Sequence, residues 1–169
     1  MNARQTLMFG GEWTDQKLEM LGQYLSRYTT ALKSQPFELV YIDAFAGTGY
    51  REAKIEEPDG APLFEELAAD ETQRFLDGSA RIALRTMPEF HKYVFVEKSA
   101  SQFARLQELT AEFPKLAQRI CLVQENCNDY LQRMCRQWDR RGRRAVFFLD
   151  PFGMQVDWDT VNSPLKKWP

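Results

Sequence analysis

The sequence predicts an α/β domain in which helices cover both faces of a parallel β-sheet. Three observations predict it. Four short runs are apolar on both faces, as in strands buried within a parallel sheet. Amphipathic helical stretches alternate with these runs. Polar residues follow directly where each predicted strand ends. The predicted strands cover residues 37–45, 93–97, 120–123 and 145–150. Because ligands of such sheets bind outside the carboxyl ends of the strands, the functional residues are expected there.

The composition is that of a globular protein, and the N-terminus and the cysteines lead us to expect a cytoplasmic one. The chain has 169 residues, about one domain, and its 44% hydrophobic and 27% charged residues exclude disordered and fibrous classes. A formal net charge of −2 argues against binding nucleic acid by bulk charge. No apolar run approaches the roughly 18 residues of a membrane span, and the N-terminus lacks an export signal. We therefore expect no membrane contact.

The first predicted element is an amphipathic helix that packs on the domain. Thr14 can cap its N-terminus, and Pro36 helps to end it. We assign residues 1–36 to this helical segment and residues 37–169 to the core. One apolar stripe is formed by leucine and tyrosine side chains at alternating three- and four-residue steps, namely Leu18, Leu21, Leu25, Tyr28 and Leu32.

Helices are predicted between the strands. An acidic, proline-containing stretch at 51–76 is expected to be an insertion, and Asp77-Gly78-Ser79 opens the helix that follows it. Further helices are expected at about 100–113 and 128–138. Asp157 to Val161 begins a last one, which Ser163-Pro164 should end.

The sequence predicts four strands and no fifth one. Each further βαβ step takes about 30 residues, but only a short tail follows Gly153. We therefore expect a sheet truncated after its fourth strand. An unpaired hydrophobic strand edge favours pairing with another chain, so we expect self-association or capture by a partner protein.

The strongest candidate loop is Asp43-Ala44-Phe45-Ala46-Gly47-Thr48-Gly49, directly after the first strand. Glycines there let the backbone turn sharply and approach a bound nucleoside, and Asp43 can accept a hydrogen bond from a cationic or hydroxylated ligand. The alternative is a plain glycine turn with a buried aspartate.

Polar residues also follow the second and third strands. Glu97 can accept hydrogen bonds from both hydroxyls of a ribose, or it can be a surface residue that caps the next helix. Asn126 and Asn128 stand after the third strand. They can read the edge of an adenine ring or serve as helix caps.

Asp150-Pro151-Phe152-Gly153 follows the fourth strand. Burying an aspartate is costly without a partner, which favours a functional role. Carbonyls beside Pro151 can face a substrate amino group, and Phe152 can stack on a planar base. The alternative is a turn that packs an aromatic ring under the sheet. Polar signals at four successive strand ends together predict a binding site.

Other reactive residues are interpreted structurally. His91, the single histidine, precedes a strand and is expected at the surface. The three cysteines, an odd number, lack metal-ligand spacing and are expected to be free thiols. One basic cluster, at Arg133, Arg136, Arg140, Arg141, Arg143 and Arg144, is interpreted as a solvated helix end and turn, with a local nucleic-acid patch as the alternative.

These motifs together resemble the class I S-adenosylmethionine-dependent methyltransferases, and more closely the bacterial three-Cys-motif partner (TcmP) family. The resemblance spans nearly the whole chain and implies a Rossmann-like fold. A complete sheet of that class has seven strands, so the resemblance also implies that this sheet is incomplete. In that family the three cysteines belong to a partner protein, so Cys121, Cys127 and Cys135 are not that motif. The residues that carry the resemblance are Glu12-Trp13-Thr14 with Lys17-Leu18, Tyr41 to Gly49, Asp77-Gly78-Ser79, Glu97, and Phe148 to Gly153.

The resemblance also implies residue roles. The Asp150-Pro151-Phe152 loop is similar to the Asp/Asn-Pro-Pro-aromatic loop of amino-group methyltransferases, so Asp150 and the Pro151 carbonyl would orient an amine while Phe152 stacks. The second proline is absent here, and Asn126 stands where related proteins often have aspartate. S-adenosylmethionine would be held by Asp43, Phe45, Ala46, Gly47, Gly49, Glu97, Asn126 and Asn128.

Two functions follow from these expectations. The first is methyl transfer to an amino group of a nucleic-acid base or a protein. The second is a non-catalytic, methyltransferase-like module that serves a protein partner such as a three-cysteine-motif protein. A nicotinamide-dependent oxidoreductase is disfavoured because the loop lacks the third glycine of GxGxxG.

Overall fold

The computed structural model describes residues 11–46, 78–139, 141–149 and 156–165, so the predicted insertion lies outside the described residues. Helices are found in all the places where the sequence predicts them within this part of the chain. In chain order the elements are α1 (Gly11–Leu32), β1 (Glu38–Asp43), a helix at 78–85, β2 (Lys92–Glu97), α3 (Ala100–Glu112), a 3-10 turn η1 (Ala117–Arg119), β3 (Ile120–Gln124), α4 (Cys127–Gln137), β4 (Arg143–Phe148) and α5 (Trp158–Leu165).

The four strands form one all-parallel sheet in the order β3-β2-β1-β4. β1 is central, and Tyr41 pairs with Tyr93 of β2 on one side and with Val146 of β4 on the other. Helices flank both faces of this sheet, so the predicted α/β, Rossmann-like fold class is confirmed. The strand order is the one found at the start of doubly wound folds.

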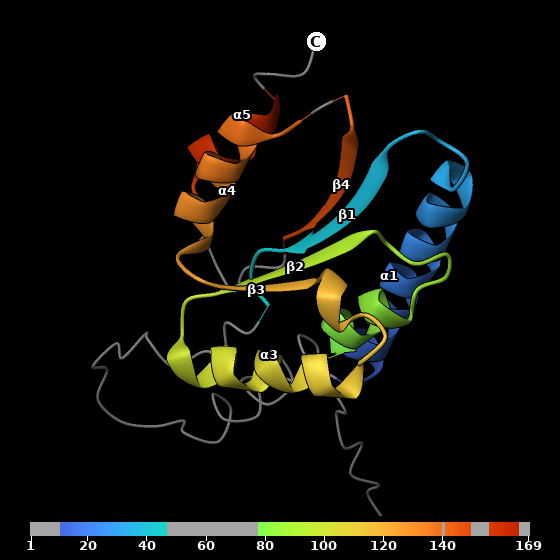
Figure 1. The fold of residues 1–169 in the computed structure, drawn as a ribbon. Helices are drawn as coiled ribbons and strands as arrows, with labels where there is room; N and C mark the ends of the chain where they lie inside the picture. Colours follow the sequence, from blue (N-terminus) through green and yellow to red (C-terminus); the bar gives the residue numbers. More distant parts are fainter. Residues whose placement is uncertain (1–10, 47–77, 140, 150–155, 166–169) are drawn as a thin grey trace, which may run out of the picture.

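The two faces carry two separate apolar cores. Alternate side chains of a strand point to opposite faces, so Leu39 and Tyr41 lie in one core and Val40 and Ile42 in the other. The first core is covered by α1, the helix at 78–85 and α3, and the second by α4 with α5 beside it (Figure 1).

Phe90 is the centre of an aromatic cluster in the first core. It is fully buried, and its ring centroid lies 5.8 Å from Tyr41, 5.8 Å from Tyr93 and 6.4 Å from Tyr28. Its backbone N–H donates to the Tyr93 hydroxyl at 3.1 Å. Burial raises the pKa of Tyr93 to about 12, so this hydroxyl stays protonated. The cluster ties α1 to the two central strands.

His91 extends the strand pairing although its side chain is exposed, as the sequence predicts. Its N–H donates to the Leu39 carbonyl at 2.9 Å, and its Nδ1 accepts from the Leu39 N–H at 2.9 Å. The single histidine therefore holds the entry of β2 against β1.

Two predicted helix ends are wrong. α1 begins at Gly11, so Thr14 is not its N-cap. The ends of helices depend on weak local preferences, so a residue that can cap a helix can also lie within its first turn. α5 continues to Leu165 through Pro164. A proline in a last turn removes only one backbone donor there, so it does not stop the helix at once.

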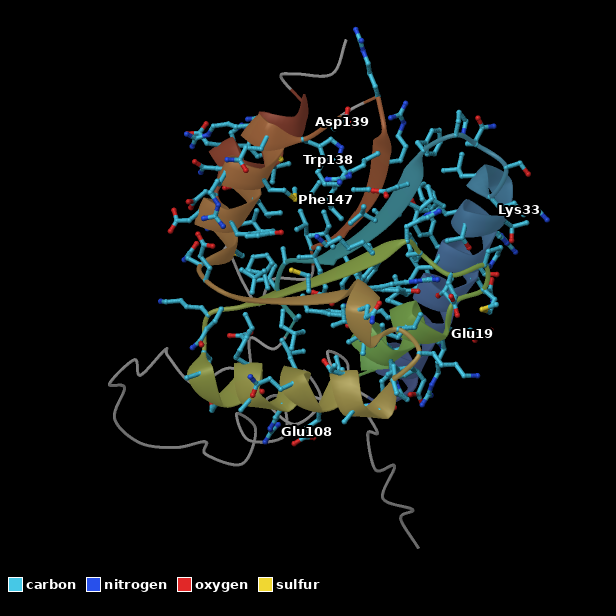
Figure 2. The ribbon with its side chains drawn as sticks, in the orientation of Figure 1. Glu19, Lys33, Glu108, Trp138, Asp139 and Phe147 are labelled. Atoms are coloured by element: carbon cyan, nitrogen blue, oxygen red, sulfur yellow. The ribbon has the colours of Figure 1, made fainter. Side chains whose placement is uncertain are left out.

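β4, like β3, is an edge strand of the described sheet. Among the described residues it pairs with β1 alone, and only Val146 of its side chains is buried. Phe147 and Trp138 lie between β4 and α4 (Figure 2), where both pack partly buried against the second core. Self-association through this edge stays a prediction.

The aromatic cluster should dominate stability on the α1 face. Phe90→Ala is expected to lower the free energy of unfolding by about 3–5 kcal/mol, because it leaves a cavity among aromatic rings. Tyr24→Ala, at a position where the ring is 55% exposed, should cost less than about 1 kcal/mol. Urea denaturation followed by circular dichroism measures both, and equal losses would contradict this account of the core.

Candidate functional site at the carboxyl edge of the sheet

Two carboxylates end adjacent parallel strands. Asp43 closes β1 and Glu97 closes β2, and Asp43 stands opposite Phe95, two residues before Glu97. Their exposed fractions are 0% and 1%. Both side chains therefore lie at the same edge of the sheet, and both need polar partners because burying a charge is costly.

Asp43 is held by donors from two directions. Its Oδ1 accepts from the Phe45 N–H at 3.2 Å, and its Oδ2 accepts from the Ser79 hydroxyl at 3.3 Å. Ser79 is itself fully buried on the helix at 78–85. The first contact turns the chain away from β1, and the second joins β1 to the helix that packs over its end.

The turn after β1 crosses the edge of the sheet. The Ala44 N–H donates to the Phe148 carbonyl at 3.2 Å, and the Ala46 N–H donates to the Val96 carbonyl at 3.1 Å. Phe45 is 2% exposed and packs in the second core. Phe45 therefore contributes a backbone N–H and core packing, while the predicted residues Gly47 and Gly49 lie outside the described residues.

Glu97 is buried, so the alternative of a surface residue is wrong. Its Oε1 accepts from the Ser99 N–H at 2.5 Å, and Ser99 is the N-cap residue of α3. The carboxylate thus fixes the backbone that leads into the next helix while it stays at the edge of the sheet.

The amides after β3 act locally as a cap and a tether. The Asn126 Oδ1 accepts from the N–H groups of Asn128 at 2.9 Å and Asp129 at 3.4 Å, as an N-cap does. The Asn128 Oδ1 accepts from the Asp157 N–H at 3.1 Å. The segment that enters α5 is therefore fastened to the first turn of α4.

The same device recurs at the ends of three strands. Asp43, Glu97 and Asn126 each accept a hydrogen bond from the backbone N–H two residues further on. Such contacts turn the chain without any ligand, so they account for polar residues at these positions. These turn contacts do not explain why Asp43 and Glu97 are carboxyl groups, because a neutral side chain can make the same contact.

Negative charge also surrounds Cys127 at the start of α4. Burial raises the pKa of this thiol to about 11, backbone N–H groups oppose the rise, and the charges of Asp157 and Glu97 add to it. Hydrogen bonds agree with this arrangement, because the Glu125 N–H donates to the Glu97 carbonyl at 3.2 Å and the Asp157 N–H to the Asn128 side chain at 3.1 Å.

Sequence reasoning missed two residues at this edge. The Ser79 contact with Asp43 joins residues 36 positions apart, and no local pattern signals it. Trp158, the first residue of α5, is 75% exposed. Its place beside the α4 N-terminus follows from the Asn128 contact with Asp157 and from the Gln132 amide, which donates to the Thr160 hydroxyl at 3.3 Å.

The predicted substrate loop of Asp150, Pro151 and Phe152 lies outside the described residues. β4 ends at Phe148, which pairs with Asp43. The chain therefore leaves β4 at the edge that carries Asp43.

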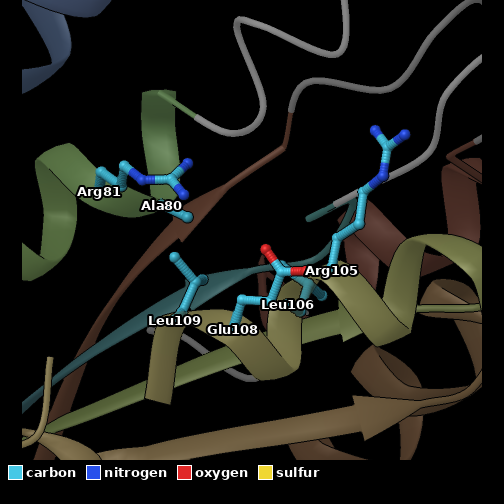
Figure 3. Close-up of a pocket in the computed structure, with 6 residues that line it drawn as sticks. All are labelled: Ala80, Arg81, Arg105, Leu106, Glu108 and Leu109. Carbon is cyan, nitrogen blue, oxygen red and sulfur yellow. The ribbon is translucent and has the colours of Figure 1, made fainter. Parts of the chain in front are cut away.

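A hollow of about 210 Å³ lies between the helix at 78–85 and α3, away from the predicted residues (Figure 3). Arg81 on its wall pairs with Glu112 at 2.8 Å. Its lining combines apolar and charged side chains, namely Ala80, Arg81, Arg105, Leu106, Glu108 and Leu109. We interpret it as a gap between two helices.

The basic cluster makes local contacts. Arg133 pairs with Glu125, and Arg143 pairs with Glu38 at 3.0 Å. The Arg144 guanidinium lies 4.7 Å from the centre of the Phe37 ring. Arg133 and Arg136 lie on α4 and Arg141 in the turn after it, as the interpretation as a helix end and turn expects, but Arg143 and Arg144 are the first residues of β4. Arg140 lies outside the described residues.

Within the described part of the chain, no group of three or more histidine, cysteine or acidic residues is placed to hold a metal ion. No helix described there is long and apolar enough to cross a membrane. No protein-family model, curated protein or solved structure matches this chain. Function must therefore be argued from the site itself.

The cap at Asn126 can be tested separately from any ligand. Asn126→Ala should lower the free energy of unfolding by about 1 kcal/mol, because the α4 N-terminus loses its acceptor. Asn126→Asp keeps an acceptor and should stay within about 0.5 kcal/mol of the original protein. Urea denaturation measures both variants, and an unchanged Asn126→Ala protein would exclude the cap.

The buried thiol should make stability fall in alkali. A thiol whose pKa is higher in the folded state stabilises that state below its unfolded pKa, and the contribution is lost as the pH rises toward about 11. The loss is at most about 1.4 kcal/mol per pH unit. Urea titrations at pH 8, 9 and 10 should therefore show a steeper decline for the original protein than for Cys127→Ala. Parallel declines would contradict the prediction.

Proposed function

We propose that this chain is a three-Cys-motif partner-like protein that binds S-adenosylmethionine at the carboxyl edge of the sheet. In this proposal it is a methyltransferase that acts on an amino group of a nucleic-acid base or a protein. The observation that carries the proposal is the pair of buried carboxylates, Asp43 and Glu97, at the ends of adjacent parallel strands. Ligands of open parallel sheets bind at this edge.

The chemistry of the pair suits this cofactor. Ionised carboxylates only accept hydrogen bonds, whereas the ribose hydroxyls and the methionine amino group of the cofactor donate them. A carboxylate after the second strand also binds the ribose of dinucleotides, but the second carboxylate, Asp43, would place negative charge at the loop that the pyrophosphate of a dinucleotide approaches. The pair therefore favours a cationic, hydroxylated nucleoside over a nicotinamide dinucleotide.

Each residue has a defined task in this proposal. Glu97 would accept from the ribose hydroxyls, and Asp43 would accept from the amino group or orient the loop through its contact with the Phe45 N–H. The Asn126 oxygen serves the α4 cap, so its amide nitrogen is the group that would donate to the adenine edge. The cofactor supplies an electrophilic methyl group, and the chain positions it and excludes water.

The acceptor would be oriented by the loop after β4. Asp150 and the Pro151 carbonyl would accept from its amino group, and Phe152 would stack on it, as the resemblance implies. β4, the strand before that loop, ends beside Asp43, because Phe148 pairs with Asp43. This adjacency supports a shared site for cofactor and acceptor.

A second candidate function is a non-catalytic module that binds a protein partner. Met20 and Tyr24 lie one turn apart on α1 and are 69% and 55% exposed. Methionine and tyrosine are enriched at protein interfaces. This α1 surface, rather than the edge of the sheet, would then carry the function, for example toward a three-cysteine-motif protein.

Calorimetric titration with S-adenosylhomocysteine separates the two functions. We expect measurable binding that weakens at least about tenfold in Asp43→Asn and in Glu97→Gln, because each variant loses a charged hydrogen-bond acceptor while keeping its shape. Glu19→Gln, which changes an exposed carboxylate on α1, should bind as the original protein does. No heat from a protein with native circular dichroism would reject the cofactor proposal and favour the module.

A further inference from the structure

Tyr41 has a hydroxyl that its packing does not explain. The side chain is 0% exposed, and its ring centroid lies 5.8 Å from that of Phe90 and 6.1 Å from that of Phe95. The hydroxyl oxygen is buried and makes no hydrogen bond within the described part of the chain. A buried polar group without a hydrogen bond costs free energy. A phenylalanine at this position would pack against the same rings without that cost.

The position of this hydroxyl connects it with the candidate site. Tyr41 precedes Asp43 by two residues on β1, so both side chains are on the same face of the sheet. Burial above all raises the pKa of Tyr41 well above its usual value, and the negative charge of Asp43 and the closeness of the hydroxyl to its carboxylate add to the rise. The hydroxyl therefore stays protonated, and beside an acceptor-only carboxylate it can act only as a donor.

Two of the contacts that Asp43 makes are long. The bond from the Ser79 hydroxyl, at 3.3 Å, is long compared with the roughly 2.7–2.8 Å typical of O–H···O bonds. The bond from the Phe45 N–H, at 3.2 Å, is also at the long end of its range. A shift of the carboxylate by a few tenths of an ångström would change which hydroxyls it meets.

We propose that Tyr41 is a positioning residue of the candidate site, and that its buried hydroxyl donates to the Asp43 carboxylate when a ligand engages that carboxylate. The inference rests on the proposed function. Binding sites need supporting contacts that hold their ligand-binding groups in one orientation. Ser79 supplies such a contact from the helix at 78–85, and Tyr41 would supply a second one from β1 itself.

Two tyrosine variants test this inference by opposite outcomes. Tyr41→Phe should leave the urea midpoint unchanged or raised, because it removes a buried hydroxyl without a partner, yet it should weaken S-adenosylhomocysteine binding about tenfold. Tyr93→Phe is the matched control, since the Tyr93 hydroxyl accepts from the Phe90 N–H away from the site. It should lower the urea midpoint and leave the affinity unchanged.

A spectroscopic readout follows the hydroxyl directly. Adding S-adenosylhomocysteine should produce a tyrosine difference spectrum in the near ultraviolet that persists in Tyr93→Phe and is reduced in Tyr41→Phe. Equal affinity of Tyr41→Phe and the original protein overturns the inference and leaves the proposed function standing. Loss of stability or of folding in Tyr41→Phe shows a structural hydroxyl and also overturns it. No binding by the original protein overturns both.

Discussion

Burial of β1 on both faces and along both edges is the constraint on which the rest of the structure depends. Leu39, Val40, Tyr41 and Ile42 are all at most 2% exposed, and the backbone pairs with β2 and β4. Apolar side chains on both faces require two helical layers. Asp43, the last residue of the strand, therefore lies fully buried at the edge of the sheet.

The need to satisfy polar groups at that edge shapes the connections. At the ends of β1, β2 and β3, a side-chain oxygen accepts from the backbone N–H two residues further on. Each contact pairs a backbone donor and also directs the chain toward its next element. The candidate ligand-binding residues therefore hold the turns of the fold as well, and their substitution affects both.

The strands and helices could be predicted from the sequence because their signals are local. Apolar runs with the periods of strand and helix place each element to within a few residues. The Thr14 cap fails because helix ends depend on weak, competing local preferences. Other features could not be predicted, because they depend on how the layers of the fold assemble. Ser79 contacts Asp43 and His91 contacts Leu39 across distant parts of the sequence. The burial of Glu97 likewise follows from the packing around it and not from a local pattern.

The turns alone do not require charge where the structure places it. Asn126 performs the same turn with a neutral amide at a partly exposed position. Asp43 and Glu97 perform it with carboxylates at 0% and 1% exposure, where an ionised group is much harder to desolvate than an amide. A neutral acceptor would make the same turn contact at lower cost, so the choice of carboxyl groups at these two positions is consistent with a further role in binding. Acceptance from the donors of a cationic, hydroxylated ligand is such a role, because it uses the charge that the turn does not.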